Sequence, residues 1–347
     1  MVRAIWRGLS KQNRSLGIEI TDSYVRICEL AGSNERKATI LHYACKELEA
    51  GVVEDGKVMD WAGLEQTLRK ALDAQKFSSR QVHFAIPSQM VMVRTLKLPD
   101  LSHKELRKLI RYEMNNNFSL AFEEPHYDFI KLPRTNVNEG SDENGQMRDV
   151  MVVAAPMQLL REYRELFERV GLVPASFEIA PFAIIRIADR AGYGEKDAVQ
   201  MIVNVNTRQS EITIFADGYL EMTRYVDVAF ESIVDKPNEH QNDWLSSFSS
   251  PEQTFQNGVL DLIAELERVM NFYSYSLNNG MRVISKLVLT GDLREMNKLE
   301  GMMKERMGLP VQMLEWQALE LASTASDKWR LCEYAVTVGL ALRGNER

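Results

Sequence analysis

The residues best able to do chemistry are scattered along the sequence. The histidines stand far apart: His42, His83, His103, His126 and His240. None has a cysteine, aspartate or glutamate at the spacing of a metal site, so we interpret them as structural residues and expect no metal. The cysteines Cys28, Cys45 and Cys332 lie singly in apolar segments. That placement is typical of small buried residues in a reducing compartment.

The common enzyme motifs are missing from the sequence. It contains no Walker-type glycine loop, no G-x-S-x-G elbow and no G-x-G-x-x-G dinucleotide fingerprint. Polar turns at strand ends remain as candidate binding positions. One turn, Thr21-Asp22-Ser23-Tyr24, interrupts the apolar residues 16–30, and a related polar turn interrupts residues 201–220.

Both of these regions have the pattern of two strands joined by a turn. In residues 16–30, Val25, Ile27 and Cys28 alternate with Arg26 and Glu29, which is typical of a half-buried strand. The Asp217-Gly218 pair after the second region predicts a further tight turn. Two such units, half a chain apart, indicate a duplicated architecture.

Composition limits the class of protein. The chain has 347 residues, of which 26% are charged, and a net charge of -7. These values fit a folded globular protein and argue against general nucleic-acid binding, which needs clustered cations. No stretch of 18 apolar residues and no secretory signal are present. We therefore expect a cytosolic protein.

The first 14 residues form a basic amphipathic segment. Its cations are Arg3, Arg7, Lys11 and Arg14, and its apolar residues are Val2, Ile5, Trp6 and Leu9. Such a segment could lie on an anionic membrane surface. A frayed tail, or a helix packed on its own domain, explains the pattern equally well.

The remaining pattern alternates strands and helices, which predicts an α/β fold. After strand 38–48, a loop at 52–56, helix 61–72 and strand 81–87, residues 88–154 form a strand, helix and hairpin that we interpret as an inserted subdomain. Ser102 and Glu105 predict a capping box at the start of its helix 104–116. The subdomain strands are 91–98, 127–132 and 148–154, with a polar loop at 135–146.

The second half of the chain continues in the same way. We expect helices at 158–170, 180–191, 259–277, 293–308 and 331–342, and strands at 286–290 and 311–314. Residues 231–258 are polar and read as a long connection with a weak helix.

Several of these segments together resemble the PilM family of type IV pilus assembly proteins, within the actin-like ATPase superfamily. Besides the two strand pairs, the resemblance rests on KLVLTGD (286–292) and YAVTVGLALR (334–343). It also rests on FAIPSQMVMVRTLKLP (84–99), ELRKLIRYEMNNNF (105–118), DVMVVAAPMQLLREYRELFERVGLVPASFEIAPFAIIR (149–186) and ELERVMNFYSYS (265–276). It implies an actin-like, ribonuclease H-like duplicated fold of two lobes, 15–195 and 199–343. The first lobe carries the inserted subdomain 88–154, and the second has a smaller subdomain at about 230–285.

The resemblance also implies a nucleotide cleft between the lobes, but this chain departs from the family at its phosphate turns. The D-I-G-S turn reads Glu19-Ile20-Thr21-Asp22, the second D-I-G reads Asn204-Val205-Asn206, and L-S-G-G reads Leu289-Thr290-Gly291-Asp292. Lost glycines and added acids both oppose phosphate binding. We expect a pseudo-ATPase without a cofactor. Retained Mg-ATP binding is the alternative, with Asn206 adopting a left-handed turn and Glu19 reaching a metal through water.

The family further implies a cytoplasmic adaptor at the inner face of the membrane. It would bind the cytoplasmic N-terminal tail of a PilN-like bitopic membrane protein and link the inner-membrane platform to the motor of a pilus, secretion or DNA-uptake (competence) machine. An FtsA-like polymerising scaffold is a further alternative, supported by residues 1–14. For the tail we expect a groove at the inserted subdomain. Its candidate residues are Met92, Arg94, Ile110, Arg111, Met114 and Phe118.

Overall fold

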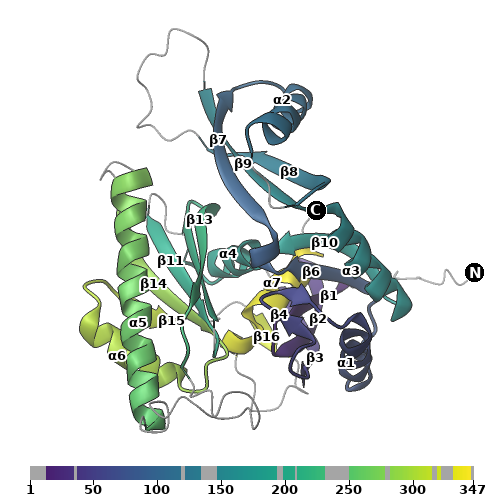
Figure 1. Ribbon diagram of the computed structural model, residues 1–347. Coiled ribbons are helices and arrows are strands. Elements are labelled where there is room, and N and C mark those ends of the chain that lie inside the picture. The colour runs from purple at the N-terminus through teal and green to yellow at the C-terminus, as the bar shows by residue number, and fades with distance from the viewer. Residues whose placement is uncertain are drawn as a thin grey trace, which may run out of the picture.

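A computed structural model of the chain describes residues 13–34, 37–118, 122–133, 147–193, 198–207, 209–230, 250–277, 282–314, 319–321 and 331–344. Two sheets form two lobes that stand side by side (Figure 1). In the described residues the first sheet has the strand order β10-β6-β1-β2-β3-β16. Its strands are β1 (Asn13–Ile20), β2 (Tyr24–Asn34), β3 (Lys37–Glu47), β6 (Gln81–Ile86), β10 (Val173–Ile179) and β16 (Leu319–Leu321).

Helices α1 (Trp61–Asp73) and α3 (Met157–Arg169) cover one face of this first sheet. Their apolar sides meet the sheet in one core that includes Leu64, Leu68, Tyr163 and Phe167. A small hairpin, β4 (Val53–Glu54) and β5 (Lys57–Val58), precedes α1 where the sequence predicted only a loop.

The second sheet repeats the topology of the first. Its order is β13-β12-β11-β14-β15, so a three-stranded antiparallel unit is again followed by two parallel strands. These strands are β11 (Val199–Val205), β12 (Gln209–Ala216), β13 (Tyr219–Asp227), β14 (Ile284–Gly291) and β15 (Val311–Met313). Helices α5 (Pro251–Asn271) and α6 (Met296–Arg306) pack on it. The repeat confirms the predicted duplication.

The inserted subdomain projects from the top of the first lobe (Figure 1). It has a sheet of order β7-β9-β8 and one helix, α2 (His103–Asn116), packed on one face. The strands are β7 (Met92–Pro99), β8 (Pro125–Lys131) and β9 (Met147–Pro156). The predicted capping box is present: the Glu105 amide donates to Ser102 Oγ, and a Glu105 carboxylate oxygen accepts from the Ser102 amide at 3.0 Å.

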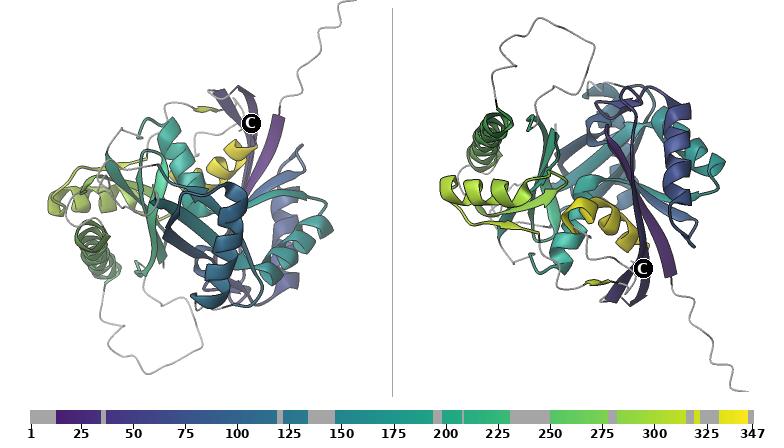
Figure 2. Two further views of the ribbon diagram at one scale, coloured as in Figure 1. Left: turned by 90° about the horizontal axis from the view of Figure 1, so that it is seen from above. Right: turned by 90° about the horizontal axis from the view of Figure 1, so that it is seen from below.

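Helices α4 (Ala180–Arg190) and α7 (Ala335–Arg343) lie between the lobes (Figure 2). They touch backbone to backbone, because a Cβ on Gly339 would stand 2.2 Å from the Ala183 carbonyl oxygen. On its other side α7 packs equally closely on β1, where a Cβ on Gly17 would stand 1.8 Å from the Thr337 carbonyl oxygen. Glycine at both positions lets the central layer form.

Several elements differ from the sequence predictions. Strand β10 was not predicted, because Pro174 argues against a strand; it lies at the sheet edge, where proline is tolerated. Helix α5 begins at Pro251, capped by Ser250, rather than at residue 259, and a π-helical turn, Phe272–Leu277, follows it. The closing helix splits into a short 3₁₀ turn, Leu331–Tyr334, and α7.

The end of the chain returns to the first lobe. Strand β16 pairs with β3, and α7 packs on β1, although the sequence had assigned residues 199–343 to the second lobe. The predictions for residues 1–12, for the loop 135–146 and for residues 231–249 concern residues outside the described ones. Within the described part, no helix combines the length and apolar character needed to span a membrane.

Candidate functional site

A cleft between the two lobes is lined by the turn between β1 and β2. Within this turn, the backbone amides find hydrogen-bond acceptors in the turn itself. Thr21 Oγ1 accepts hydrogen bonds from the amides of Ser23 at 3.3 Å and Tyr24 at 3.0 Å. The Thr21 amide itself donates to the Tyr24 carbonyl oxygen at 2.9 Å. A phosphate turn needs amides that point at the ligand. Here the threonine hydroxyl occupies the position from which an anion would accept these bonds.

Asp22 also serves the protein itself. Its carboxylate accepts hydrogen bonds from the amides of Asp55 at 2.8 Å and Gly56 at 2.9 Å. Both of those residues have positive φ, 49° and 75°, so the carboxylate holds a tight turn between β4 and β5. The acid that replaced a phosphate-turn residue has become a structural acceptor.

The second and third turns are packed against each other. The Val205 carbonyl oxygen accepts from the amides of Asp292 at 3.1 Å and Leu293 at 3.3 Å, and the Asn206 amide donates to Gln209. Gly291 has a φ of 122°, and a Cβ there would stand 2.1 Å from the Val205 carbonyl oxygen. The one glycine that survives at these turns is therefore needed for strand packing, with or without a nucleotide.

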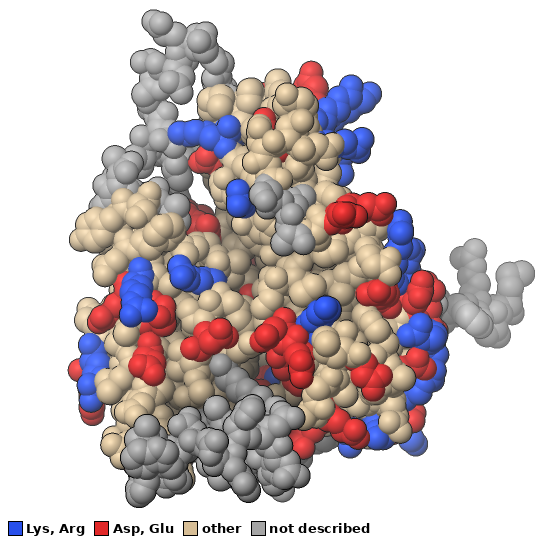
Figure 3. Space-filling view, in the orientation of Figure 1, with Lys and Arg blue, Asp and Glu red and all other residues tan. Residues whose placement is uncertain are grey.

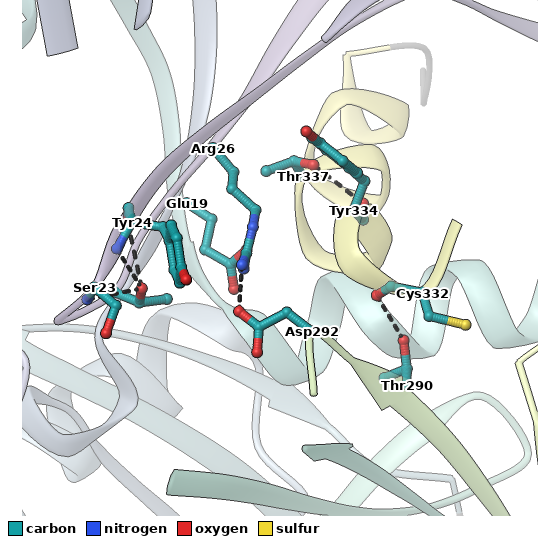
Figure 4. A network of polar contacts seen from close by, with 10 residues as sticks. Glu19, Ser23, Tyr24, Arg26, Thr290, Asp292, Cys332, Tyr334 and Thr337 are labelled. Carbon is teal, nitrogen blue, oxygen red and sulfur yellow. Dashed lines mark hydrogen bonds and ion pairs between the residues drawn. The ribbon is translucent and has the colours of Figure 1, made fainter. Parts of the chain in front are cut away.

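An arginine from the first lobe crosses the cleft (Figure 4). Arg26, on β2, forms a hydrogen-bonded ion pair with Asp292 of the second lobe, and its Nη1 lies 3.7 Å from Glu19 Oε2. The three side chains are only 5%, 10% and 10% exposed. Burial alone would lower the pKa of Arg26, but the carboxylates of Asp292 and Glu19 outweigh burial and raise it. The cleft thus contains an internal cation, already paired.

Acidic groups outnumber cations in this cleft. Burial raises the pKa of Glu19 to about 7, although the nearby Arg26 lowers it in part. Burial likewise raises the pKa of Glu211, on β12, to about 7, and a hydrogen bond from Ser88 offsets part of that rise. Near neutral pH each of these two carboxyls is therefore protonated in part of the molecules and charged in the rest. A triphosphate entering here would meet further negative charge.

The remaining space in the cleft is small. It measures about 170 Å³ and is lined from both lobes by residues that include Glu19, Asn204 and Asn206. Ligand pockets usually measure roughly 300–1,000 Å³. Among the described residues, no group of three or more His, Cys, Asp or Glu is arranged to hold a metal ion. Six of the seven residues predicted at the phosphate turns line this cleft, all except Gly291, which packs against Val205 beside it. Thr21 and Asp22 bond to neighbouring backbone, and Glu19 and Asp292 face Arg26.

A second and larger hollow separates the inserted subdomain from the first lobe. We call this hollow the interlobe groove, and it is distinct from the interlobe cleft that the phosphate turns surround. It measures about 1070 Å³. Strands β8 and β9 bound it above, β10 and α4 bound it below, and the β12–β13 turn lies at one end. Apolar side chains such as Ile130, Phe177 and Phe182 line it together with charged ones such as Arg186 and Asp189. Ile130 is 44% exposed.

Ion pairs to one buried carboxylate, that of Glu178, connect the elements at the floor of the interlobe groove. Arg186 Nη1 and Nη2 lie 2.8 and 3.1 Å from the two carboxylate oxygens of Glu178, and Arg343 pairs with the same carboxylate. Strands β8 and β10, which both contribute residues to the lining of the groove, are sheet edges in the described residues.

Sequence comparison matches this chain to a family model described as "Type IV pilus assembly protein PilM" over residues 17–229, which is more than half of the chain. The chain belongs to the PilM family. A chain of the "PilM-PilN type IV pilus biogenesis complex" is 21% identical and superposes with a TM-score of 0.79, over 96% of this chain and 99% of that one. The fold is therefore the predicted actin-like one, with a subdomain inserted in the first lobe.

More distant structures superpose less well. A Bacteroides thetaiotaomicron protein with an actin-like ATPase fold is 13% identical, with a TM-score of 0.46 over 87% of this chain and 91% of its own. The ethanolamine utilization protein EutJ from Carboxydothermus hydrogenoformans is 12% identical, with a TM-score of 0.49 over 95% and 89%.

The six predicted tail-binding residues of this PilM-family chain gather on the α2 side of the inserted sheet, away from the interlobe groove. Ile110 and Met114 are buried in the subdomain core, and Met92 packs against that core. The Arg94 guanidinium lies 5.1 Å from the centre of the Phe118 ring, and Arg111 is exposed.

Two residues of the cleft were not predicted as functional. One is Arg26: the half-buried strand pattern predicted it to be exposed, yet it is buried and pairs with Asp292. Glu211 is the other. A charged residue inside an otherwise apolar strand is the sequence signal that could have identified them.

The histidines contact their own protein. His83 Nδ1 lies 2.7 Å from Ser176 Oγ, and burial lowers the pKa of His83 to about 4. His103 stacks on Phe129 with ring centres 4.4 Å apart, His42 meets Phe77 edge-on, and His126 lines the interlobe groove. His240 lies outside the described residues.

Proposed function

We propose that this chain is a non-catalytic adaptor of a type IV pilus or related machine, acting at the cytoplasmic face of the inner membrane. The observation that carries the proposal is the Glu19–Arg26–Asp292 cluster, which fills the cleft with the protein's own charges. The amides of Ser23, Tyr24, Asp292 and Leu293 are bonded internally as well. Together these features remove the means by which a related protein would hold ATP.

Calorimetry tests the nucleotide half of this proposal. We expect Mg-ATP to give no saturable heat up to about 1 mM, a limit that corresponds to roughly 4 kcal/mol of binding free energy. Mg-ADP and Mg²⁺ alone are the matched titrations. Saturable binding in the micromolar range would instead establish the ATP-binding alternative.

For the partner, we propose the N-terminal tail of a PilN-like bitopic membrane protein, bound in the interlobe groove. The groove supports this occupant because two of the strands that line it, β8 and β10, are sheet edges within the described residues, where an extended peptide could add its backbone, and because apolar side chains line it as well. The exposed carboxylate of Asp189 at the rim could pair with a cationic residue of the tail.

Ile130→Glu is expected to weaken binding of a synthetic tail peptide by at least ~10-fold, about 1.4 kcal/mol, because it buries a charge against an apolar chain. Fluorescence anisotropy with a labelled peptide of the N-terminal tail of a PilN-like protein measures the effect. Ile130 is partly exposed on an edge strand, so the fold should tolerate the change.

Arg94→Ala is the control for that measurement, because Arg94 belongs to the originally predicted surface on the α2 side of the same subdomain. It should leave the affinity for the tail unchanged. If Arg94→Ala weakens binding and Ile130→Glu does not, the tail binds on the α2 side and the interlobe groove is not its site.

A further inference from the structure

The outer face of α2 carries a row of cations that the tail groove does not use. Lys104, Lys108 and Arg111 follow one another at helical spacing over about 10 Å of the axis, and all three are exposed. Within the described residues, none of the three has a carboxylate oxygen within 4.0 Å. We call these three residues the α2 basic row. Blue side chains gather at this edge of the subdomain in Figure 3.

The row is unusual for this chain, whose net charge is -7. On α3, for comparison, the exposed Arg161 and Arg164 alternate with Glu162, Glu165 and Glu168, which neutralise that face. Of the acids of α2, Glu113 lies on the opposite side of the helix at 100° per residue, whereas Glu105 lies three residues before Lys108 and interacts with it electrostatically without forming an ion pair within 4.0 Å. The α2 basic row therefore presents three positive charges that Glu105 alone on this helix offsets in part.

A pocket lies at the end of the row. It measures about 340 Å³ and combines apolar walls from Met114, Pro125 and Tyr127 with the guanidinium of Arg111. Its neighbour Arg107 is held in place, because it pairs with Asp128 at 3.2 Å and lies over the rings of Tyr127 and Phe129. Tyr127 Oη also donates to the Arg107 carbonyl oxygen at 2.8 Å. One wall is thus rigid, while Arg111 is available to an anion.

We propose that the α2 basic row and this pocket form a second docking surface, for an acidic segment of a partner protein that inserts one apolar side chain beside Arg111. Carboxylates spaced along the segment would pair with Lys104, Lys108 and Arg111, and the pocket would fix its register. The α2 basic row lies on the α2 side of the inserted sheet, and its pocket meets the interlobe groove at His126 on β8.

An anionic membrane fits this surface less well. Glu123 and Glu124 are exposed next to Pro125, at the pocket. A flat bilayer pressed against the row would approach these carboxylates, and it could not fill a concave pocket. A peptide segment can pass beside them.

The test uses a fluorescein-labelled 12-residue peptide of glutamate with leucine at every fourth position. The full chain should bind it at low salt, and Lys104→Ala/Lys108→Ala/Arg111→Ala should weaken binding at least ~10-fold. The wild-type affinity should fall as salt rises, because the contacts are exposed charges. Arg161→Ala/Arg164→Ala/Arg294→Ala removes the same charge from exposed sites elsewhere and should have little effect.

Three results would overturn the proposal. An equal loss of peptide affinity in the two triple variants would mean that binding depends only on the net charge of the protein. Binding to vesicles containing about 30% phosphatidylserine, lost in the first variant, without peptide binding would identify a membrane surface. Dimerisation of the wild type that the first variant abolishes, seen by sedimentation, would identify a second copy of the chain. Equal melting temperatures of all three proteins establish that folding is not the cause.

Discussion

Replacing Gly17 with alanine is expected to destabilise the protein by about 3 kcal/mol or more, at the upper end of what overpacking usually causes. The added Cβ would stand 1.8 Å from the Thr337 carbonyl oxygen and 2.9 Å from the Ala341 amide nitrogen. Both are backbone atoms of α7, so no side-chain rotation relieves the clash. The helix must move away from β1, and it then loses its contact with α4 as well.

Gly301→Ala is the matched substitution. Gly301 is an exposed glycine inside α6, and a Cβ there meets no atom within 4 Å. Alanine should stabilise that helix by ~0.5–1 kcal/mol through its higher helix propensity. Thermal and urea unfolding of the two variants measure both changes. Shifts of the same sign and similar size would contradict the close α7–β1 packing.

Arg26→Met should cost about 3–5 kcal/mol of unfolding free energy at pH 8, because it leaves two carboxylates buried without their cation. Since Arg26 and Asp292 belong to different lobes, small-angle scattering should also show a larger radius of gyration. Methionine matches the length of the arginine stem and keeps its apolar packing. Chemical unfolding at fixed pH measures the first effect.

The deficit of Arg26→Met should shrink as the pH falls. Glu19 has a folded pKa of about 7 already, raised from 4.5 by burial, and loss of Arg26 removes the main influence that lowers it. A carboxyl with a raised folded pKa contributes its full stability below the unfolded pKa and loses it as pH rises through the folded pKa. The deficit is therefore smallest near pH 5 and largest above pH 7.

A second variant separates this explanation from simple loss of packing. Arg26→Met combined with Glu19→Gln and Asp292→Asn removes the buried charges, so most of the stability should return, and the difference from Arg26→Met should grow with pH. A triple variant as unstable as Arg26→Met at every pH would show that the arginine acts through its shape alone.

Local sequence signals predicted the elements well. The capping box at Ser102 and the Asp217-Gly218 turn both appear as expected, with φ of 52° and 78° in the turn. Each depends on residues a few positions apart. Strands β10 and β16 were missed because both are edge strands whose existence depends on pairing with distant β6 and β3.

The sequence was enough to locate the cleft but not to predict the side-chain contacts inside it. The altered turns pointed to the right residues, yet the contact that fills the cleft joins Arg26 to Asp292, 266 positions later. Alternation in β2 wrongly predicted Arg26 to be exposed, because half-burial was assumed for a strand that is covered on both faces. Only the meeting of the two lobes determines where that side chain lies.

The turn between β1 and β2 also indicates how easily the loss of a phosphate turn could be reversed by mutation. Glycine at position 21 would leave the amides of Ser23 and Tyr24 without their acceptor, and serine at position 22 would release the amides of Asp55 and Gly56. Each lost acceptor is worth about 1 kcal/mol. Any single step toward an anion-binding turn therefore passes through a less stable protein before a ligand can compensate. Selection for folding alone would be enough to preserve the present turn.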